Sequence, residues 1–213
     1  MAQNANDQAE TVLFRILRGT SVDGLAGIAF KRFEENVPVV RPLLNITRAE
    51  IERYCEENNL EPRRDLTNDE PIYTRNKIRL DIIPELEKLN PNIVSTLNRL
   101  AESASADKEY LYEVSNEAYR DVLLEEGETD PDTGDVCYIK LDNKKLKTLH
   151  TAIRYRVYNL AATKVGMKEN MARVYLESID KVSDSLNGKA YTELNGGFRV
   201  KRETNKLVFF KEN

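Results

Sequence analysis

Two pairs of charged side chains have the types and spacing that a site for charged ligands needs. Asp7 and Glu10 lie three residues apart near the start of the chain, and Arg75 and Arg79 lie four residues apart further along. Residues three or four apart share one face of a helix. Paired carboxylates bind an ammonium group, and two guanidinium groups on one face form a clamp for phosphate.

Each pair also has a plainer interpretation. Asp7 and Glu10 are placed to accept hydrogen bonds from the free amides at a helix start, as in an Asp variant of the capping box. Arg75 and Arg79 are also compatible with a solvated helix face that pairs with acidic neighbours. The residues alone leave both interpretations open for both pairs.

Composition limits the class of protein. The 213 residues carry a net charge of −4, with 40% hydrophobic and 32% charged residues. This is typical of a soluble protein without a global basic signature for nucleic acid. We find no membrane-length apolar run and no signal-peptide pattern, and we expect a cytoplasmic protein that does not bind membranes.

Two cysteines and one histidine make a zinc site or a Cys-His or Ser-His nucleophile improbable. We predict no metal site, and we expect His150 to have a structural role.

The elements that position the two charged pairs follow from hydrophobic spacing and turn residues. Apolar residues at helical spacing predict a helix over residues 7–18 that ends at Gly19. Thr47 and Glu50 match a capping box that opens a helix to about residue 58. A further helix is predicted over 73–83, where Pro84 interrupts or restarts it.

The rest of the chain is mainly helical and ends in strands. The predicted elements are an extended connector at 37–44, a long helix from about 91 to 125, a loop at 126–134, a strand at 136–139, helices at 143–165 and 168–184, and strands at 189–194, 198–202 and 207–211. Asn195-Gly196-Gly197 is a hairpin turn signal. The fold class is therefore mainly α with a small C-terminal antiparallel β-sheet (α+β). We divide the chain into residues 1–36, a basic connector over 37–83, and a helical domain over 84–213.

The order of several motifs resembles the tRNA(Ile)-lysidine synthetase family over nearly the whole chain. These motifs are Asn6-Asp7-Gln8-Ala9-Glu10-Thr11, Leu17-Arg18-Gly19-Thr20, Arg41-Pro42-Leu43-Leu44, Asp65-Leu66-Thr67-Asn68, Arg75-Asn76-Lys77-Ile78-Arg79 and Gly196-Gly197-Phe198-Arg199-Val200. The resemblance implies that residues 1–36 are a remnant of an α/β ATP-pyrophosphatase-type catalytic domain. It also implies that 37–83 complete the active site and that 84–213 bind tRNA.

The chain departs from the family pattern at its start. The family carries His-His-x-Asp-Asp-Gln-Ala-Glu-Thr, whereas this chain has Gln3 and Asn4 at the two His positions and Asn6 at the first Asp position. The family's Ser-Gly-Gly-x-Asp-Ser phosphate loop does not occur in the 213 residues. We therefore expect an N-terminally truncated member that is inactive as this chain alone.

The resemblance also implies a reaction and a set of ligands. The family ligates L-lysine to C2 of the anticodon cytidine of tRNA(Ile), with ATP and Mg²⁺, through an adenylated intermediate. By resemblance, Asp7 and Glu10 recognise the lysine substrate, while Arg18, Arg75, Arg79 and Asn68 contact ATP phosphate, tRNA or substrate. The implied partners are L-lysine and tRNA(Ile) with a CAU anticodon. No cofactor is expected to bind tightly to this chain.

Two rival interpretations accompany this one. The chain is also compatible with a non-catalytic tRNA-binding module, or with another tRNA-modifying enzyme of the ATP-pyrophosphatase group. The lack of a cysteine pair argues against a thiolase within that group. The sequence does not decide the oligomeric state, and a homodimer is compatible with it.

Overall fold

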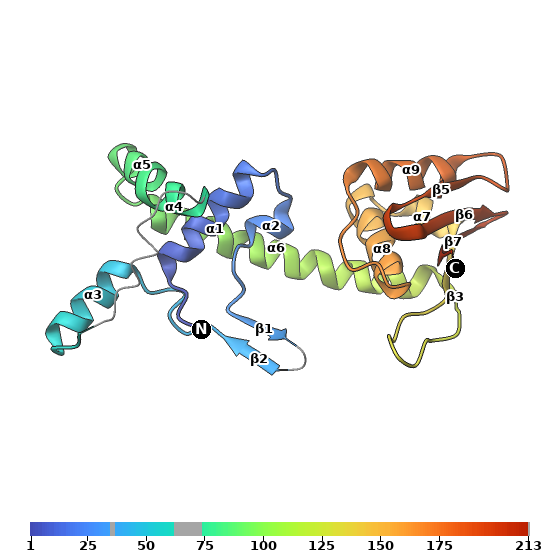
Figure 1. The fold of residues 1–213 in the computed structure, drawn as a ribbon. Helices are drawn as coiled ribbons and strands as arrows, with labels where there is room; N and C mark the ends of the chain where they lie inside the picture. The colour runs from blue at the N-terminus through green and yellow to red at the C-terminus, as the bar shows by residue number, and fades with distance from the viewer. Residues whose placement is uncertain (35–36, 62–73, 213) are drawn as a thin grey trace. The chain divides into compact units, whose positions relative to one another are not determined.

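The computed structural model describes residues 1–34, 37–61 and 74–212. The chain divides into two compact units, residues 1–109 and 110–213, each of which is described by itself (Figure 1). Helix α6 (Ile93–Val122) contributes residues to both units. In the described ranges, no helix combines the length and the apolar character that crossing a membrane would require. The three-part division expected from sequence stays a prediction.

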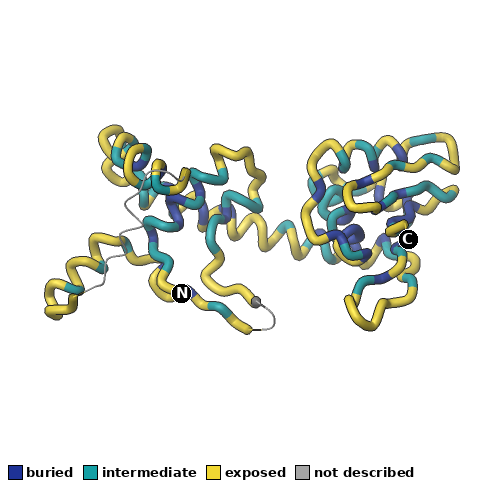
Figure 2. Tube along the Cα trace, in the orientation of Figure 1, coloured by how far each residue is buried: buried dark blue, intermediate teal, exposed yellow. Residues whose placement is uncertain are grey.

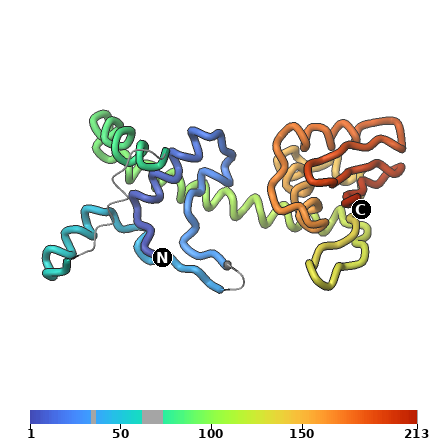
Figure 3. The backbone as a smooth tube through the Cα atoms, in the orientation of Figure 1, coloured from blue at the N-terminus to red at the C-terminus, as the bar shows by residue number. Residues whose placement is uncertain are grey.

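The first unit is built from helices and one short hairpin. Its elements are α1 (Ala5–Leu17), α2 (Val22–Leu25), β1 (Lys31–Glu34), β2 (Val37–Val40), α3 (Arg48–Glu57), α4 (Thr74–Lys77), the π-helix η2 (Ile78–Ile82), α5 (Ile83–Leu89) and the first part of α6. Figure 3 traces the path from α1 through α2 into the antiparallel β1–β2 hairpin. The extended connector predicted over 37–44 is confirmed in part, because residues 37–40 are extended as strand β2 whereas residues 42–45 form turns.

A small apolar core holds α1 in the first unit. Ala9 and Val12 of α1 pack with Leu97 and Ala101 of α6, and Leu25 of α2 packs against them. These four core residues are buried, whereas α3 contains no fully buried residue (Figure 2). One face of α1 therefore packs into the core of the unit, and another face presents side chains to α4 and η2.

Local signals explain where most of these helices start. The predicted capping box of Thr47 and Glu50 is confirmed at the start of α3. Pro84 lies in the first turn of α5, where its missing N–H costs no hydrogen bond, so the predicted restart at Pro84 is also confirmed. The helix predicted over about 73–83 is confirmed for the described residues 74–83, but its second half winds as a π-helix.

The second unit is a five-stranded antiparallel sheet with helices against one face. Its further elements are β3 (Leu123–Glu126), β4 (Tyr138–Asp142), α7 (Asn143–Thr148), α8 (Thr151–Lys164), α9 (Arg173–Asp184), β5 (Tyr191–Glu193), the turn η3 (Asn195–Gly197), β6 (Phe198–Glu203) and β7 (Lys206–Lys211). The strand order is β3-β4-β7-β6-β5. Alternate residues of β4 and β6 face the helices, and Phe209 of β7 contacts Tyr158 of α8 with ring centroids 6.0 Å apart.

The predicted antiparallel sheet is confirmed, with local corrections. The last three strands and the turn at Asn195–Gly197 occur where the sequence placed them, and Gly196 adopts a φ of 77° that favours glycine. Strand β3 was not predicted. The helix expected over 143–165 is two helices, α7 and α8, and the His150 side chain caps the second by accepting from the Ala152 amide at 3.2 Å.

Candidate functional site

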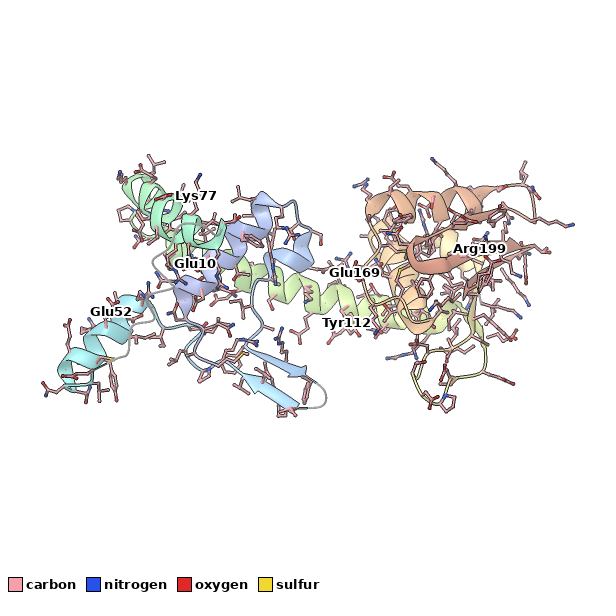
Figure 4. All side chains as sticks on the ribbon, in the orientation of Figure 1. Glu10, Glu52, Lys77, Tyr112, Glu169 and Arg199 are labelled. Carbon is pink, nitrogen blue, oxygen red and sulfur yellow. The ribbon has the colours of Figure 1, made fainter. Side chains whose placement is uncertain are left out.

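The four charged residues singled out in the sequence meet in one cluster. Asp7 and Glu10 of α1 face Arg75 of α4 and Arg79 of η2, and we call these four residues the charge cluster. Figure 4 shows Glu10 on α1 beside α4, with Lys77 on the outer side of α4. The two pairs are separated by more than 60 residues of chain, so tertiary packing alone brings them together.

Arg79 binds Glu10 through both carboxylate oxygens. The Nε atom of Arg79 donates to Glu10 Oε1 at 2.6 Å, and its Nη2 atom donates to Oε2 at 3.0 Å. This is the two-pronged geometry that a planar guanidinium makes with a carboxylate. The same Nη2 atom also donates to Asp7 Oδ1 at 3.2 Å. Arg79 therefore fixes the positions of both carboxylates.

Arg75 binds the same two carboxylates by longer contacts. Its Nε atom donates to Glu10 Oε2 at 3.1 Å, and its Nη2 atom lies 3.4 Å from Asp7 Oδ1. Arg75 and Arg79 thus share two acceptors, Asp7 Oδ1 and Glu10 Oε2, which we call the shared oxygen pair. The other two oxygens have separate partners, since Glu10 Oε1 binds Arg79 and Asp7 Oδ2 accepts from the Asn4 amide at 3.0 Å.

Burial differs sharply among the four side chains. The Glu10 side chain is 2% exposed and that of Arg79 is 18% exposed, whereas the Arg75 side chain is 47% exposed. A buried carboxylate needs a partner that compensates for lost hydration, and Arg79 provides it. The hydrogen bond to Glu10 raises the pKa of Arg79 above its ordinary value. The Arg75 side chain, in contrast, is nearly half exposed to solvent.

Two helical features place these side chains. Asp7 and Glu10 are one turn apart on α1 and project toward α4 and η2, which pack against α1. On the other side, η2 winds with the wider π-helical spacing, and its Ile78 side chain is completely buried. A π-helical turn shifts side chains relative to an α-helix and is frequent at functional sites. Arg79 lies in this turn and binds Glu10, while the buried Ile78 anchors the turn.

Helix α1 does begin with a capping box, but the box lies one turn earlier than predicted. Asn4 is the N-cap of α1, and its Oδ1 accepts from the amides of Asn6 and Asp7, both at 3.0 Å. Asp7 completes the box by accepting from the Asn4 amide. The box is therefore Asn4–Asp7, and the predicted alternative of an Asp7–Glu10 box is wrong. Asp7 accepts the hydrogen bond of the capping box at Oδ2 and binds the two arginines of the charge cluster at Oδ1.

The positions that depart from the family motif have structural contacts. Gln3 accepts from the Nε atom of Arg41 at 2.5 Å, and Arg41 is almost completely buried. The Asn6 side chain accepts from the Arg48 amide at 2.9 Å. Gln3 and Asn6 therefore tie the start of α1 to Arg41, which follows β2, and to Arg48 at the start of α3.

Two further side chains hold the loop after α2 against α1, and sequence reasoning missed them. Gln8 is buried and pairs with both backbone groups of Ile28, accepting from its amide at 2.6 Å and donating to its carbonyl at 3.3 Å. Arg15 donates to the carbonyls of Gly24 and Gly27 at 2.7 and 2.8 Å. Their only sequence signal is their spacing of seven residues, which places both on one helix face.

Arg18 is not part of the charge cluster. It is the C-cap of α1, it is exposed, and its guanidinium lies 5.3 Å from the centre of the Phe14 ring. Eight residues of helix separate it from Glu10, or about 12 Å along the axis. The remaining predicted site residue, Asn68, lies outside the described residues.

The cluster is suited to charged organic groups rather than to a metal ion. Both carboxylates already bind guanidinium groups, and in the described ranges no three acidic, His or Cys side chains converge as metal ligands do. Two carboxylates beside two guanidiniums form an electrically balanced site. Such a site can exchange one cation for another, and an exposed guanidinium can turn to an anion.

Comparison with known proteins first defines a class. The PP-loop domain family matches residues 1–86, a range that holds the whole charge cluster. Residues 1–86 therefore have the sequence pattern of a PP-loop domain.

Individual relatives then narrow the family. The chain is 40% identical over 198 residues to a tRNA(Ile)-lysidine synthase of Clostridium perfringens, covering 92% of this chain and 39% of that protein. It is 33% identical over 216 residues to that of Clostridioides difficile, covering 100% of this chain and 44% of the relative. For Caldanaerobacter subterraneus the identity is 35% over 223 residues, with 100% and 45% coverage. The chain belongs to the tRNA(Ile)-lysidine synthase family, and it spans about two fifths of the length of these relatives.

Proposed function

We propose that this chain takes part in the ATP-dependent ligation of L-lysine to the anticodon cytidine of tRNA(Ile), and that Asp7 and Glu10 receive the lysine ammonium group. The observation that carries the proposal is the shared oxygen pair, on which two cationic side chains already converge. An oxygen pair that binds two guanidinium groups also has the charge and donor geometry for an ammonium group. Membership of the lysidine synthase family makes free lysine the cation to test first.

The two arginines have different roles in this proposal. Arg79 is tied to Glu10 by two hydrogen bonds, so it positions the carboxylates rather than contacting phosphate. Arg75 is half-exposed and has the longer contacts, so its guanidinium can turn toward a phosphate of ATP or tRNA. Arg18 is a second exposed cation for the same phosphates, at the far end of α1.

The ligands ATP and Mg²⁺ belong to the proposed reaction. The exposed guanidinium of Arg75 fits a phosphate group. The charge cluster does not fit a magnesium ion, because two further positive charges would lie beside Arg79, which stays bound to both carboxylates. We therefore assign no step to a metal ion at this place, and we assign the tRNA contacts of the proposal to the range 84–213.

The first experiment measures ligand recognition by the chain. We expect L-lysine to bind in calorimetry, and we expect L-norleucine, which lacks the terminal ammonium, not to bind. Asp7→Asn and Glu10→Gln each lower lysine affinity at least tenfold, since a charge-assisted contact is lost. Glu87→Gln on the exposed side of α5 is the matched control and leaves affinity unchanged. Equal binding of lysine and norleucine contradicts the assignment.

A second assay tests the reaction itself. Labelled L-lysine, ATP and an isoleucine tRNA transcript with a CAU anticodon are incubated with the chain, and a transcript with a GAU anticodon serves as control. Lysine transfer that depends on both ATP and the CAU anticodon supports the whole proposed function and overturns the expectation that this chain alone is inactive. Binding of tRNA without any lysine binding supports a different function instead.

That second candidate is a non-catalytic tRNA-binding module. It is favoured by the start of α1, where Gln3, Asn4 and Asn6 stand in place of charged or titratable residues of the family motif and make structural hydrogen bonds. In such a module the charge cluster is only a structural tie between α1 and α4. The lysine titration separates the two functions, because a structural tie gives no selectivity for an ammonium ligand.

A further inference from the structure

The charge cluster is balanced before any ligand arrives. Two carboxylates, Asp7 and Glu10, face two guanidiniums, Arg75 and Arg79. If an ammonium group joined the shared oxygen pair while both arginines stayed, three cations would face two anions in a partly buried place. Like charges at such distances repel strongly away from bulk water. Binding of a cation is therefore favoured when one resident cation leaves.

The contacts distinguish which arginine can leave. Arg79 makes contacts of 2.6, 3.0 and 3.2 Å, and one of them goes to Glu10 Oε1, an oxygen that Arg75 does not touch. Arg75 makes contacts of 3.1 and 3.4 Å, and both go to the shared oxygen pair. Its side chain is 47% exposed, against 18% for Arg79. Arg75 is the more exposed of the two arginines and has the longer contacts, so its ion pairs cost less free energy to break than those of Arg79, and Arg75 is the exchangeable cation.

We propose that Arg75 is a resident counter-cation that the lysine ammonium replaces at Asp7 Oδ1 and Glu10 Oε2, and that the released guanidinium then takes a phosphate group. This inference rests on the proposed function, since it needs lysine to bind at the cluster. Arg79 stays in place as a positioning residue and keeps the cluster at two cations and two anions. This exchange couples the binding of a cationic ligand to the binding of an anionic ligand at a single site.

The linkage has a thermodynamic consequence. Lysine frees Arg75 for phosphate, and phosphate draws Arg75 away from the oxygens that lysine needs. Each ligand therefore raises the affinity for the other by the same factor. The phosphate can belong to ATP or to tRNA, since both present the same oxygen atoms to a guanidinium. The experiment separates these two sources.

The test is a set of lysine titrations of the wild-type chain and of three variants. In Arg75→Gln the competing cation is gone, so we expect lysine to bind about three- to fivefold more tightly, the order of magnitude for a weak ion pair with one half-exposed partner. In Arg79→Gln we expect weaker lysine binding, because Glu10 loses its anchor. Lys77→Gln removes the same charge from an exposed position on the same helix, and it leaves lysine affinity unchanged.

Coupling is measured in the same titrations. For wild type, saturating ATP or an isoleucine tRNA transcript is expected to raise lysine affinity by about the factor gained in Arg75→Gln, and the ligand that does so identifies the source of the phosphate. In Arg75→Gln neither ligand changes lysine affinity. If wild type binds lysine but Arg75→Gln binds it no better, the exchange is refuted while the proposed function stands. If neither chain binds lysine, the proposed lysine site itself is refuted, and the exchange with it.

A spectroscopic measurement checks the motion directly. The Nε–H resonances of Arg75 and Arg79 report whether each guanidinium is held by a carboxylate. Lysine is expected to move the Arg75 resonance to the position of a solvated arginine and to leave that of Arg79 in place. Displacement of both resonances, or of Arg79 alone, overturns the assignment of Arg75 as the exchangeable cation.

Discussion

The guanidinium of Arg79 donates hydrogen bonds to both carboxylate oxygens of Glu10, at 2.6 and 3.0 Å, although the two residues are 69 positions apart in the chain. The Glu10 side chain is almost completely buried beside it. This pair connects η2 to α1 and sets the position of the carboxylate that we assign to lysine binding. The stability of the first unit and the shape of its candidate site therefore depend on the same contact.

Replacing Glu10 by Gln is expected to destabilise the first unit by about 3 kcal/mol, because it leaves the mostly buried Arg79 without its carboxylate. Urea unfolding followed by circular dichroism at pH 7 measures the loss. Glu87→Gln, on an exposed surface of α5, is the control and is expected to change stability by less than about 0.5 kcal/mol. Equal effects of the two variants contradict the importance of the buried pair.

The cap of α1 gives a second prediction. Asn4→Ala removes the side chain that accepts from the amides of Asn6 and Asp7, and we expect a loss of about 1 kcal/mol. Asn4→Ser keeps an acceptor at the cap and is expected to retain most of the stability. Hydrogen exchange of the amides in the first turn of α1 reports the change locally. Unaltered exchange in Asn4→Ala argues that the cap contributes nothing.

Two glycines with positive φ, Gly27 after α2 and Gly19 after α1, form a matched pair for testing the contact between Gln8 and the loop after α2. Gly27 has a φ of +62°, and a Cβ atom there would lie 2.3 Å from Gln8 Oε1, which accepts from the Ile28 amide. Gly19 has a φ of +75°, with nothing within 4 Å of its Cβ position. Both alanine variants incur backbone strain of about 1 kcal/mol. Only Gly27→Ala also disrupts the Gln8 contact, so it is expected to lower the melting temperature further than Gly19→Ala.

The pH dependence of stability can be followed at the start of α3. Hydrogen bonds from the Thr47 hydroxyl and amide lower the pKa of Glu50 below its ordinary value of 4.5. A carboxyl whose pKa is lower in the folded state stabilises the fold above the unfolded pKa, and this contribution is lost as pH falls through the folded pKa. We therefore expect α3 to lose stability below about pH 4.5.

Two variants test that assignment. Thr47→Val removes the hydroxyl donor, so the pKa of Glu50, followed by the NMR shift of its carboxyl carbon, is expected to rise toward 4.5. Glu50→Gln removes the titrating group and flattens the acid side of the stability curve. If the pKa of Glu50 is the same in Thr47→Val as in wild type, the hydroxyl is not the cause of the shift.

The sequence by itself determined the elements whose signals are local. The helix start at Thr47, the restart at Pro84 and the turn at Asn195–Gly197 are each specified by a few neighbouring residues, and each occurs as predicted. Such features depend on backbone conformations and hydrogen bonds within one turn of chain. The mainly α fold with its C-terminal antiparallel sheet followed from the same local patterns.

Only the tertiary structure decided how the charged pairs are used. Sequence reasoning singled out Asp7 with Glu10 and Arg75 with Arg79, but it treated them as two separate groups with different ligands. Their mutual ion pairs depend on the packing of α1 against α4 and η2, and on the π-helical winding of η2. Contacts between residues 65 to 72 positions apart leave no periodic trace in the sequence, because the intervening chain can fold in many ways.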